Sequence, residues 1–313
     1  MVAWHISPRA STAALVALVA LDVALVATAL RSTHANGIDV RPVSVATTST
    51  DPSAVTPTGT APLSSASLTA ANAPLEKILV AVDEQRAWRI SAGSCSSGGA
   101  SLARTEDGGK TWVKGDPRVR RIIRVRPSDN RVAFIVGADS DCVAKLQDTS
   151  DGGGTWTSGG DVGRAWFRDP ENPLVVWAPG SATSQPCGTR TVLDLAVDFT
   201  TGGARVLCAD GLVRSATDSG SRWADVGKVT GAVALAVPTD SPAETYVAQL
   251  GAPKCAGVQI LRVSQRLATS CIKVAIPKDS GQISLSLPKG SGWLSVDGTT
   301  MRSTDGLVTW TAS

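Results

Sequence analysis

Thr105-Glu106-Asp107-Gly108-Gly109-Lys110-Thr111-Trp112 is the stretch that decides the fold, because it recurs along the chain. The run from Thr149 to Trp156 repeats it after a shift of 44 residues, and weaker copies end at Trp223 and Trp310. The segments between them alternate short β-type runs with Gly, Asp, Asn and Pro turns and contain no long helical period. Repeats of about 40 to 50 residues that hold several strands are typical of propeller blades. The sequence therefore predicts an all-β domain, a β-propeller.

The repeated stretch has the chemistry of a tight turn between strands. An Asp side chain accepts backbone N–H groups within such a turn, Gly adopts positive φ, and Trp supplies a large apolar face for packing. We call the four copies Trp turns, at residues 105–112, 149–156, 218–223 and 303–310. The Trp turns resemble the Asp-box, or BNR, repeat, which has the pattern Ser/Thr-x-Asp-x-Gly-x-Thr/Ser-Trp and joins the two outer strands of a blade.

This resemblance covers residues 75–313, and it differs in strength between the copies. The first two copies match in full, the fourth lacks the Gly, and the third lacks the leading hydroxyl and the Thr. The family includes sialidases, other glycoside hydrolases, sortilin-type receptors and photosystem II assembly-factor-like propellers. The resemblance implies structural roles for the residues of the box, namely Asp107, Gly109, Thr111, Trp112, Asp151, Gly153, Thr155, Trp156, Asp218, Trp223, Asp305, Thr309 and Trp310.

The spacing of the Trp turns predicts six four-stranded blades. Blade 1 runs from about residue 75 to 116 and blade 2 from about 120 to 160. The 67 residues between Trp156 and Trp223 are too many for one blade, so we expect a shortened blade 3 without a box and a boxed blade 4. The 87 residues from Trp223 to Trp310 predict an unboxed blade 5 and a boxed blade 6.

Six cysteines indicate disulfides and an oxidising compartment, because no CxxC or paired Cys/His spacing occurs. On the blade frame we expect Cys95, Cys142, Cys187 and Cys255 in equivalent turns, between the second and third strands of their blades. The pairs Cys95–Cys142, Cys187–Cys208 and Cys255–Cys271 form a sequential set, although six cysteines allow fifteen pairings.

An apolar stretch from Ala13 to Leu30, interrupted by Asp22 and Thr28, predicts a membrane helix. At about 1.5 Å per residue it would span roughly 27 Å, close to the thickness of a bilayer core. We expect residues 1–31 to anchor the protein in the cell membrane as a single pass, with the propeller on the extracytoplasmic side. The same stretch also fits a signal peptide cleaved near His34, which would make the protein secreted. Residues 32–74, rich in Ser, Thr, Pro and Ala, predict a disordered linker.

The composition excludes several functions. A net charge of only +3 predicts no nucleic-acid partner. Both histidines, His5 and His34, precede the propeller, so a Ser-His or Cys-His catalytic pair within it is excluded. No metal site and no cofactor are expected, since neither a ligand set nor a phosphate loop can be assembled.

One enzymatic hypothesis stays open, a sialidase-like glycoside hydrolase. Phe167-Arg168-Asp169-Pro170 resembles the Phe/Tyr-Arg-Ile-Pro motif that supplies an arginine of the sialidase carboxylate clamp. Against it, the motif follows two boxes instead of preceding the first, and its third position is an acid. The one tyrosine, Tyr246, is expected to pack within a strand. The turn-forming residues Asp-Pro and Asn-Pro also explain this segment.

A non-catalytic binding or assembly scaffold for a protein or glycan ligand fits the sequence best. The candidate binding surface is the basic run around residues 118–126. Alternation along that strand predicts Arg120, Arg124 and Arg126 on one face with Ile122 between them. A charged strand edge that resists aggregation explains the same residues. No catalytic residue is assigned.

Overall fold

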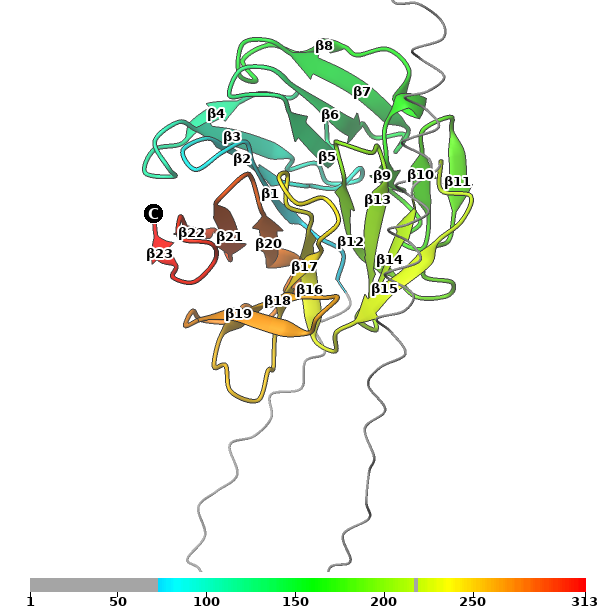
Figure 1. The fold of residues 1–313 in the computed structure, drawn as a ribbon. Helices are drawn as coiled ribbons and strands as arrows, with labels where there is room; N and C mark the ends of the chain where they lie inside the picture. Colours follow the sequence, from blue (N-terminus) through cyan, green and yellow to red (C-terminus); the bar gives the residue numbers. More distant parts are fainter. Residues whose placement is uncertain (1–72, 217–218) are drawn as a thin grey trace, which may run out of the picture. The chain divides into compact units, whose positions relative to one another are not determined.

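The computed structural model describes residues 73–216 and 219–313, and this part of the chain folds into a ring of six β-sheets (Figure 1). The predicted six-bladed propeller is confirmed. The predicted membrane helix, nearly all of the linker and Asp218 lie outside the described residues. Within the described part, no helix is long and apolar enough to cross a membrane.

Five of the blades are four-stranded antiparallel sheets whose strands follow chain order. Blade 1 contains β1 (Lys77–Ala81), β2 (Ala87–Ser91), β3 (Ser101–Thr105) and β4 (Val113–Gly115); blade 2 contains β5 (Arg121–Pro127), β6 (Ala133–Ala138), β7 (Ala144–Thr149) and β8 (Thr157–Ser158). Blade 4 contains β12 (Val192–Val197), β13 (Ala204–Cys208), β14 (Leu212–Ala216) and β15 (Ala224–Lys228); blade 5 contains β16 (Ala232–Ala236), β17 (Tyr246–Gln249), β18 (Val258–Arg262) and β19 (Leu267–Ile272). Blade 6 contains β20 (Ile283–Ser286), β21 (Gly292–Val296), β22 (Thr299–Ser303) and β23 (Thr311–Ala312), after the 3₁₀ turn η3 (Ser280–Gln282).

Blade 3 has three strands, β9 (Phe167–Arg168), β10 (Val176–Ala178) and β11 (Ala182–Ser184), after the 3₁₀ turn η2 (Val162–Arg164). Its innermost strand runs opposite to its neighbours β5 and β12. Trp166, before β9, bonds Gly202 beyond the end of β12, whereas Arg168 bonds Val192 at the start of β12. Strand β9 therefore corresponds to the second strand of the other blades, and the inner strand is the one that blade 3 lacks.

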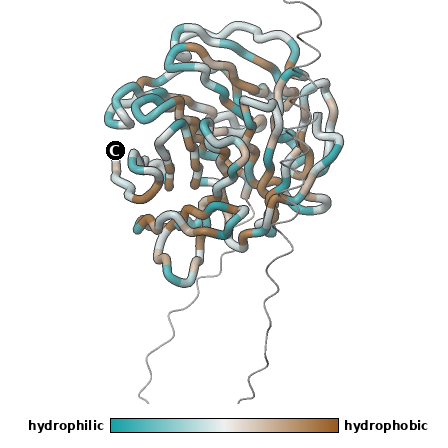
Figure 2. Tube along the Cα trace, in the orientation of Figure 1, coloured by the Kyte–Doolittle hydropathy of each residue, from teal (hydrophilic) through white to brown (hydrophobic). Residues whose placement is uncertain are grey.

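The core lies in the inner and second strands of the blades. Figure 2 shows hydrophobic residues concentrated there and hydrophilic residues along the outer loops. Every residue of β16 and of β21 is buried. The inner strands β5, β12 and β16 each carry a bulge near their first residues, which holds one extra residue and interrupts the alternation of faces.

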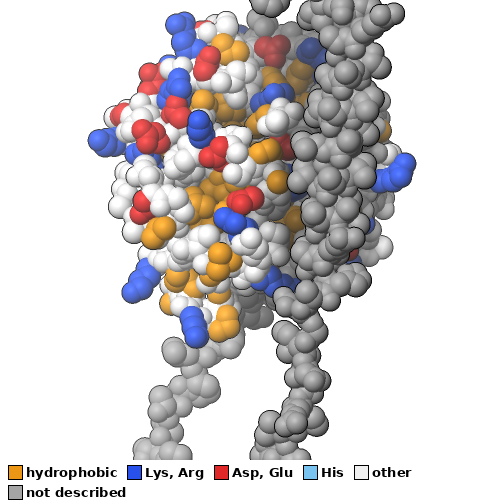
Figure 3. Space-filling view, viewed as in Figure 1, with side chains coloured by type: hydrophobic (Ala, Val, Ile, Leu, Met, Phe, Trp, Pro, Cys, Tyr) orange, Lys and Arg blue, Asp and Glu red, His pale blue; other side chains and the backbone are white. Residues whose placement is uncertain are grey.

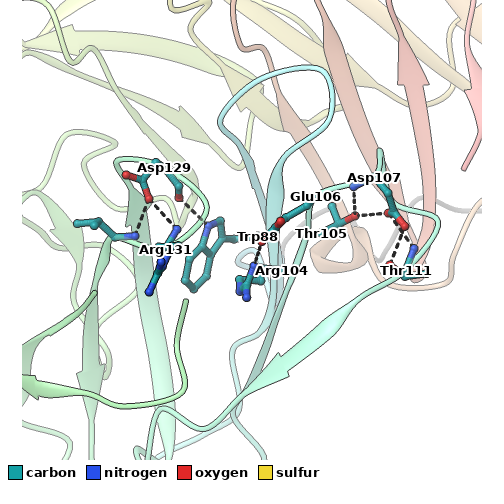
Figure 4. A network of polar contacts seen from close by, with 9 residues as sticks. Trp88, Arg104, Thr105, Glu106, Asp107, Thr111, Asp129 and Arg131 are labelled. Atoms are coloured by element: carbon teal, nitrogen blue, oxygen red, sulfur yellow. Dashed lines mark hydrogen bonds and ion pairs between the residues drawn. The ribbon is translucent and has the colours of Figure 1, made fainter. Parts of the chain in front are cut away.

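In blades 1, 3 and 6, a tryptophan at the start of the second strand bonds the following blade. The indole N–H of Trp88 donates to the Asp129 carbonyl over 3.1 Å, as Figure 4 shows. Trp166 bonds Gly202 in the same way, and Trp293 bonds Asp83. Blade 2 has no such donor, because its residue at this position is Phe134 and blade 3 lacks the first turn that would accept the bond.

The Trp turns of blades 1, 2 and 6 share one hydrogen-bond pattern, which Figure 4 shows for blade 1. In blade 1, Asp107 Oδ1 accepts the Thr111 N–H over 2.9 Å, and the Thr105 hydroxyl accepts the Gly109 N–H over 2.9 Å. Bonds from Thr111 hold the pKa of Asp107 down at about 2. Blade 6 keeps the pattern although Leu307 stands at the Gly position, with a φ of 71°. The three turns are therefore folded by their Asp and hydroxyl residues.

Each Trp turn reaches back to the preceding blade. Trp223 donates to Ser184 of blade 3 over 3.1 Å, and Trp310 donates to Ser270 of blade 5 over 3.0 Å. Trp156 packs in the core cluster of Trp88 in blade 1, and Trp112 packs in that of Trp293 in blade 6. Because blades 3 and 5 have no Trp turn, blades 2 and 4 receive no such tryptophan.

All three disulfides of the sequential set are present, Cys95–Cys142, Cys187–Cys208 and Cys255–Cys271, and no cysteine is free. Cys95, Cys142 and Cys255 lie between second and third strands, as predicted. The prediction for Cys187 was wrong, since it lies in the connection from β11 to β12. Blade 3 has one strand fewer than expected, so the chain passes Cys187 after leaving that blade.

Candidate functional site

The inner strands surround a channel with two unlike ends. Its cavity, of about 120 Å³, is lined by residues of β1, β5, β9, β12, β16 and β20. One end, which we call the Trp-turn end, lies where the inner strands finish and the Trp turns fold. The other, the cysteine end, lies where the inner strands begin, beside the turns that carry Cys95, Cys142 and Cys255.

The cysteine end is crossed by the chain as it enters the propeller. The Leu75 N–H donates to the Leu193 carbonyl of blade 4, on the opposite side of the ring, over 3.0 Å. Arg168 of blade 3 donates to the Leu75 carbonyl over 3.0 Å and to the Val192 carbonyl over 3.5 Å. Leu75 itself is only 8% exposed. This end of the channel is therefore covered by the protein's own backbone.

Three charged side chains face the channel, and each is satisfied by backbone groups. Asp194 accepts the N–H groups of Leu195 and Leu235 over 2.7 and 2.8 Å, and Arg124 donates to a backbone carbonyl of blade 3. Burial lowers the pKa of Arg168 to about 10 and that of Arg124 to about 9, and it raises the pKa of Asp194. These groups hold the blades together at the point where blade 3 lacks its inner strand.

The Trp-turn end is lined by apolar side chains together with hydroxyls, including Val197, Val237, Leu287 and Thr239. Phe199 is the large exposed residue of this mouth, with 47% of its surface accessible. The guanidinium of Arg126 lies 4.6 Å from its ring centre, in cation–π range. Figure 3 shows one face of the molecule, on which hydrophobic side chains gather centrally and charges are spread around them. An aromatic ring with an adjacent cation is a surface suited to binding.

The structure corrects the predicted arrangement of Arg120, Arg124 and Arg126. The bulge in β5 falls between Ile122 and Arg124, so the expected common face does not exist. Arg120 donates to the carbonyls of Cys95 and Ser96 at the cysteine end. Arg124 and Arg126 do lie together, each 5.8 Å from the ring centre of Phe134. Of the three, Arg126 is the exposed one.

The residues of the sialidase-like motif do not form a clamp for a substrate carboxylate. Such a clamp needs guanidinium groups free to form bidentate bonds, whereas Arg168 is held by two backbone carbonyls. Tyr246 is buried and bonds Glu244 and Arg262 over 2.9 and 3.0 Å, and burial raises its pKa. It occupies the second-strand position of Trp88 and packs in the core between blades 5 and 6.

Among the described residues, no group of three or more His, Cys, Asp or Glu side chains could hold a metal ion. Acids in or near the turns between strands, which could otherwise supply a catalytic carboxylate pair, have local partners. Asp83 accepts the Arg86 N–H, Asp198 accepts the Thr200 N–H, and Asp139 pairs with Lys145.

No protein-family model and no curated protein match this chain. Solved structures do match it. "YCF48 bound to D1 peptide" has 15% identity and a TM-score of 0.41, with 77% of this chain and 82% of that chain covered. YCF48 from Cyanidioschyzon merolae is similar at 15% identity and a TM-score of 0.40, with 77% and 86% covered. The SapL1 lectin in complex with alpha methyl fucoside has 12% identity and a TM-score of 0.46, with 79% and 97% covered.

Proposed function

We propose that this protein is a non-catalytic binding or assembly scaffold of the Asp-box propeller type, which holds a protein or glycan ligand at the Trp-turn end of its channel. The observation that carries the proposal is the contrast between the two ends. The cysteine end is covered by Leu75, while the opposite mouth presents Phe199 and Arg126. Concave sites with an aromatic and a few polar groups are where propellers and other rigid folds bind ligands.

The setting that we propose is the extracytoplasmic side of a cell membrane, to which residues 1–31 anchor the chain. The three disulfides support an oxidising compartment, and the apolar stretch from Ala13 to Leu30 supports the anchor. Alkaline carbonate extraction of native membranes tests this part, because an anchored protein stays in the pellet and a secreted one does not.

Binding of the full-length protein to a glycan array and a peptide array tests the function. We expect a specific ligand class, and we expect Phe199→Ala to weaken its binding at least tenfold. Val113→Ala is the matched control, since Val113 is an equally exposed apolar residue on the outer strand of blade 1. No specific binding on either array would contradict the proposal.

The rival function, a sialidase-like hydrolase, is tested with a panel of sialosides and aryl glycosides. We expect no turnover, because the guanidinium of Arg168 already bonds two carbonyls and the hydroxyl of Tyr246 is buried. Turnover that Tyr246→Phe abolishes, in a variant that melts at the temperature of the parent protein, would replace the scaffold proposal with the hydrolase.

A further inference from the structure

Blade 2 has a vacant socket on the side that faces blade 3. We use the word socket for the surface of the second and third strands that is covered, in blades 1, 3, 5 and 6, by the Trp turn of the next blade. Trp88 of blade 1 and Trp293 of blade 6 are 0% exposed at the base of their sockets, and Trp166 of blade 3 is 3% exposed. Phe134, the matching residue of blade 2, is only half-buried. The difference arises because blade 3 supplies neither a Trp turn nor an inner strand to cover it.

The turn η2 covers only part of this surface. Val162 packs in the cluster of Leu146, and Arg164 donates to the Gly159 carbonyl. The rest stays open as a cavity of about 410 Å³, lined by Val132, Phe134, Asp148 and Thr157 among others. Val132 is 42% exposed. The structure thus leaves an aromatic and an aliphatic side chain in contact with solvent at a place that a Trp turn covers in blades 1 and 6.

The third-strand side chain of this socket has a charge opposite to that in the filled sockets of blades 1 and 6. The position of Asp148, on the third strand, is taken by Arg104 in blade 1 and by Arg302 in blade 6. Each arginine lies against the backbone of the incoming Trp turn, and Arg302 donates to the Gly108 carbonyl over 3.3 Å. Asp148 is exposed and has only acceptor oxygens. It therefore suits a cation or N–H donor on the occupant.

We propose that this socket, the cavity lined by Val132, Phe134, Asp148 and Thr157, binds a tryptophan on a turn of a partner protein, with a lysine or arginine beside it that pairs with Asp148. The four Trp turns of the chain itself are the precedent, since each places a tryptophan on the preceding blade. Tryptophan and arginine side chains anchor protein interfaces out of proportion to their number. The socket adjoins the channel mouth, because Arg126 lies 5.8 Å from the ring centre of Phe134 and 4.6 Å from that of Phe199, but the two cavities share no lining residue.

The test uses the full-length protein and a cyclic peptide with the sequence of residues 105–112, which carries Lys110 and Trp112. Saturation-transfer NMR should detect contact through the indole ring, with a Kd of about 1 mM or tighter, as for a single weak anchor. The same peptide with Trp112→Ala should bind at least tenfold more weakly. Equal binding of the two peptides would overturn the proposal.

Variants of the protein locate the site. Asp148→Lys should weaken peptide binding at least tenfold. The control is Asp116→Lys, which changes the charge of another exposed residue by the same amount and should leave peptide binding unchanged. Phe134→Trp, which restores the residue of blade 1, should retain binding. Unchanged binding by Asp148→Lys, or loss on Phe199→Ala instead, would overturn the proposal. The proposal would also be overturned if methyl glycosides saturated the Asp148-dependent site while the peptide made no contact with it, because the socket would then be a carbohydrate site.

Discussion

Trp88 of blade 1 and Phe134 of blade 2 occupy the same place in neighbouring blades, yet their surroundings differ. Trp88 is fully buried and bonds the first turn of blade 2, and Trp156 packs in the same core cluster. Phe134 faces blade 3, which has no such first turn and no Trp turn, although Trp177 of blade 3 packs in the same cluster. The comparison shows that the aromatic side chain of a second strand is buried by the inner strand and the Trp turn of the blade that follows.

The largest effect should separate these two residues. Trp88→Ala should destabilise the protein by about 3–5 kcal/mol, as large core truncations do. It also leaves the Asp129 carbonyl without its indole partner. Phe134→Ala should cost about 1 kcal/mol, since the Phe134 side chain is only half-buried. Urea unfolding of both variants measures the difference, and equal losses would show that blade 3 covers Phe134 as well as blade 2 covers Trp88.

Disulfide removal should give the next largest effect and should differ between blades. Replacing Cys187 and Cys208 with Ser should cost about 2–4 kcal/mol. It also frees the connection from blade 3, so amide exchange should accelerate in β9–β11 first. Removing Cys255 and Cys271, which lie in one blade, should accelerate exchange in β18 and β19 instead. Acceleration spread evenly over all blades in both variants would contradict this local coupling.

Acid should produce the smallest effect, confined to the Trp turns. Bonds from Thr111 and Thr309 hold the pKa of Asp107 and Asp305 at about 2 in the folded protein, below the value of about 3.9 for an unfolded chain. The folded state thus binds protons less readily, and this stabilisation is complete above pH 4 and is lost as the pH falls through 2. Melting temperatures between pH 5 and 2 should fall more steeply for the parent protein than for Asp107→Asn. A parallel fall in both would show that the turn carboxylate does not contribute.

The repeated turn made much of the fold predictable. Its spacing predicted six blades, the short third blade and the boxless fifth, because a blade has a nearly constant length. The same frame favoured Cys95–Cys142, whereas the sequence left the full set of pairs open. Cys187 was misplaced because it was assigned to a turn within blade 3, whereas it lies in the connection from β11 to β12.

A second repeated pair could have revealed that missing strand. Ala87-Trp88, Ala165-Trp166 and Gly292-Trp293 all open second strands, with Ala133-Phe134 as the variant in blade 2. Aligning Ala165-Trp166 with Ala87-Trp88 places β9 as a second strand, with no room for a strand before it.

The candidate site was less predictable than the fold. Phe199 lies in a turn and has no neighbouring motif, and Arg168 looked like a substrate ligand because sequence does not show that it bonds the Leu75 carbonyl. The grouping of Arg120, Arg124 and Arg126 failed on one bulge, which shifts every later side chain of β5 to the other face. Such local irregularities depend on packing between blades and leave no simple pattern in the residues.

The crossing of the channel by Leu75 also has a mechanical consequence. The chain is fastened to Leu193 of blade 4, on the far side of the ring, before it forms the near side. Force applied at residue 74 should therefore load the ring across its diameter and leave the seam between blades 1 and 6 unloaded at first. Pulling with optical tweezers should show a first rupture that weakens in Arg168→Lys, because the Leu75 carbonyl then loses part of its anchor.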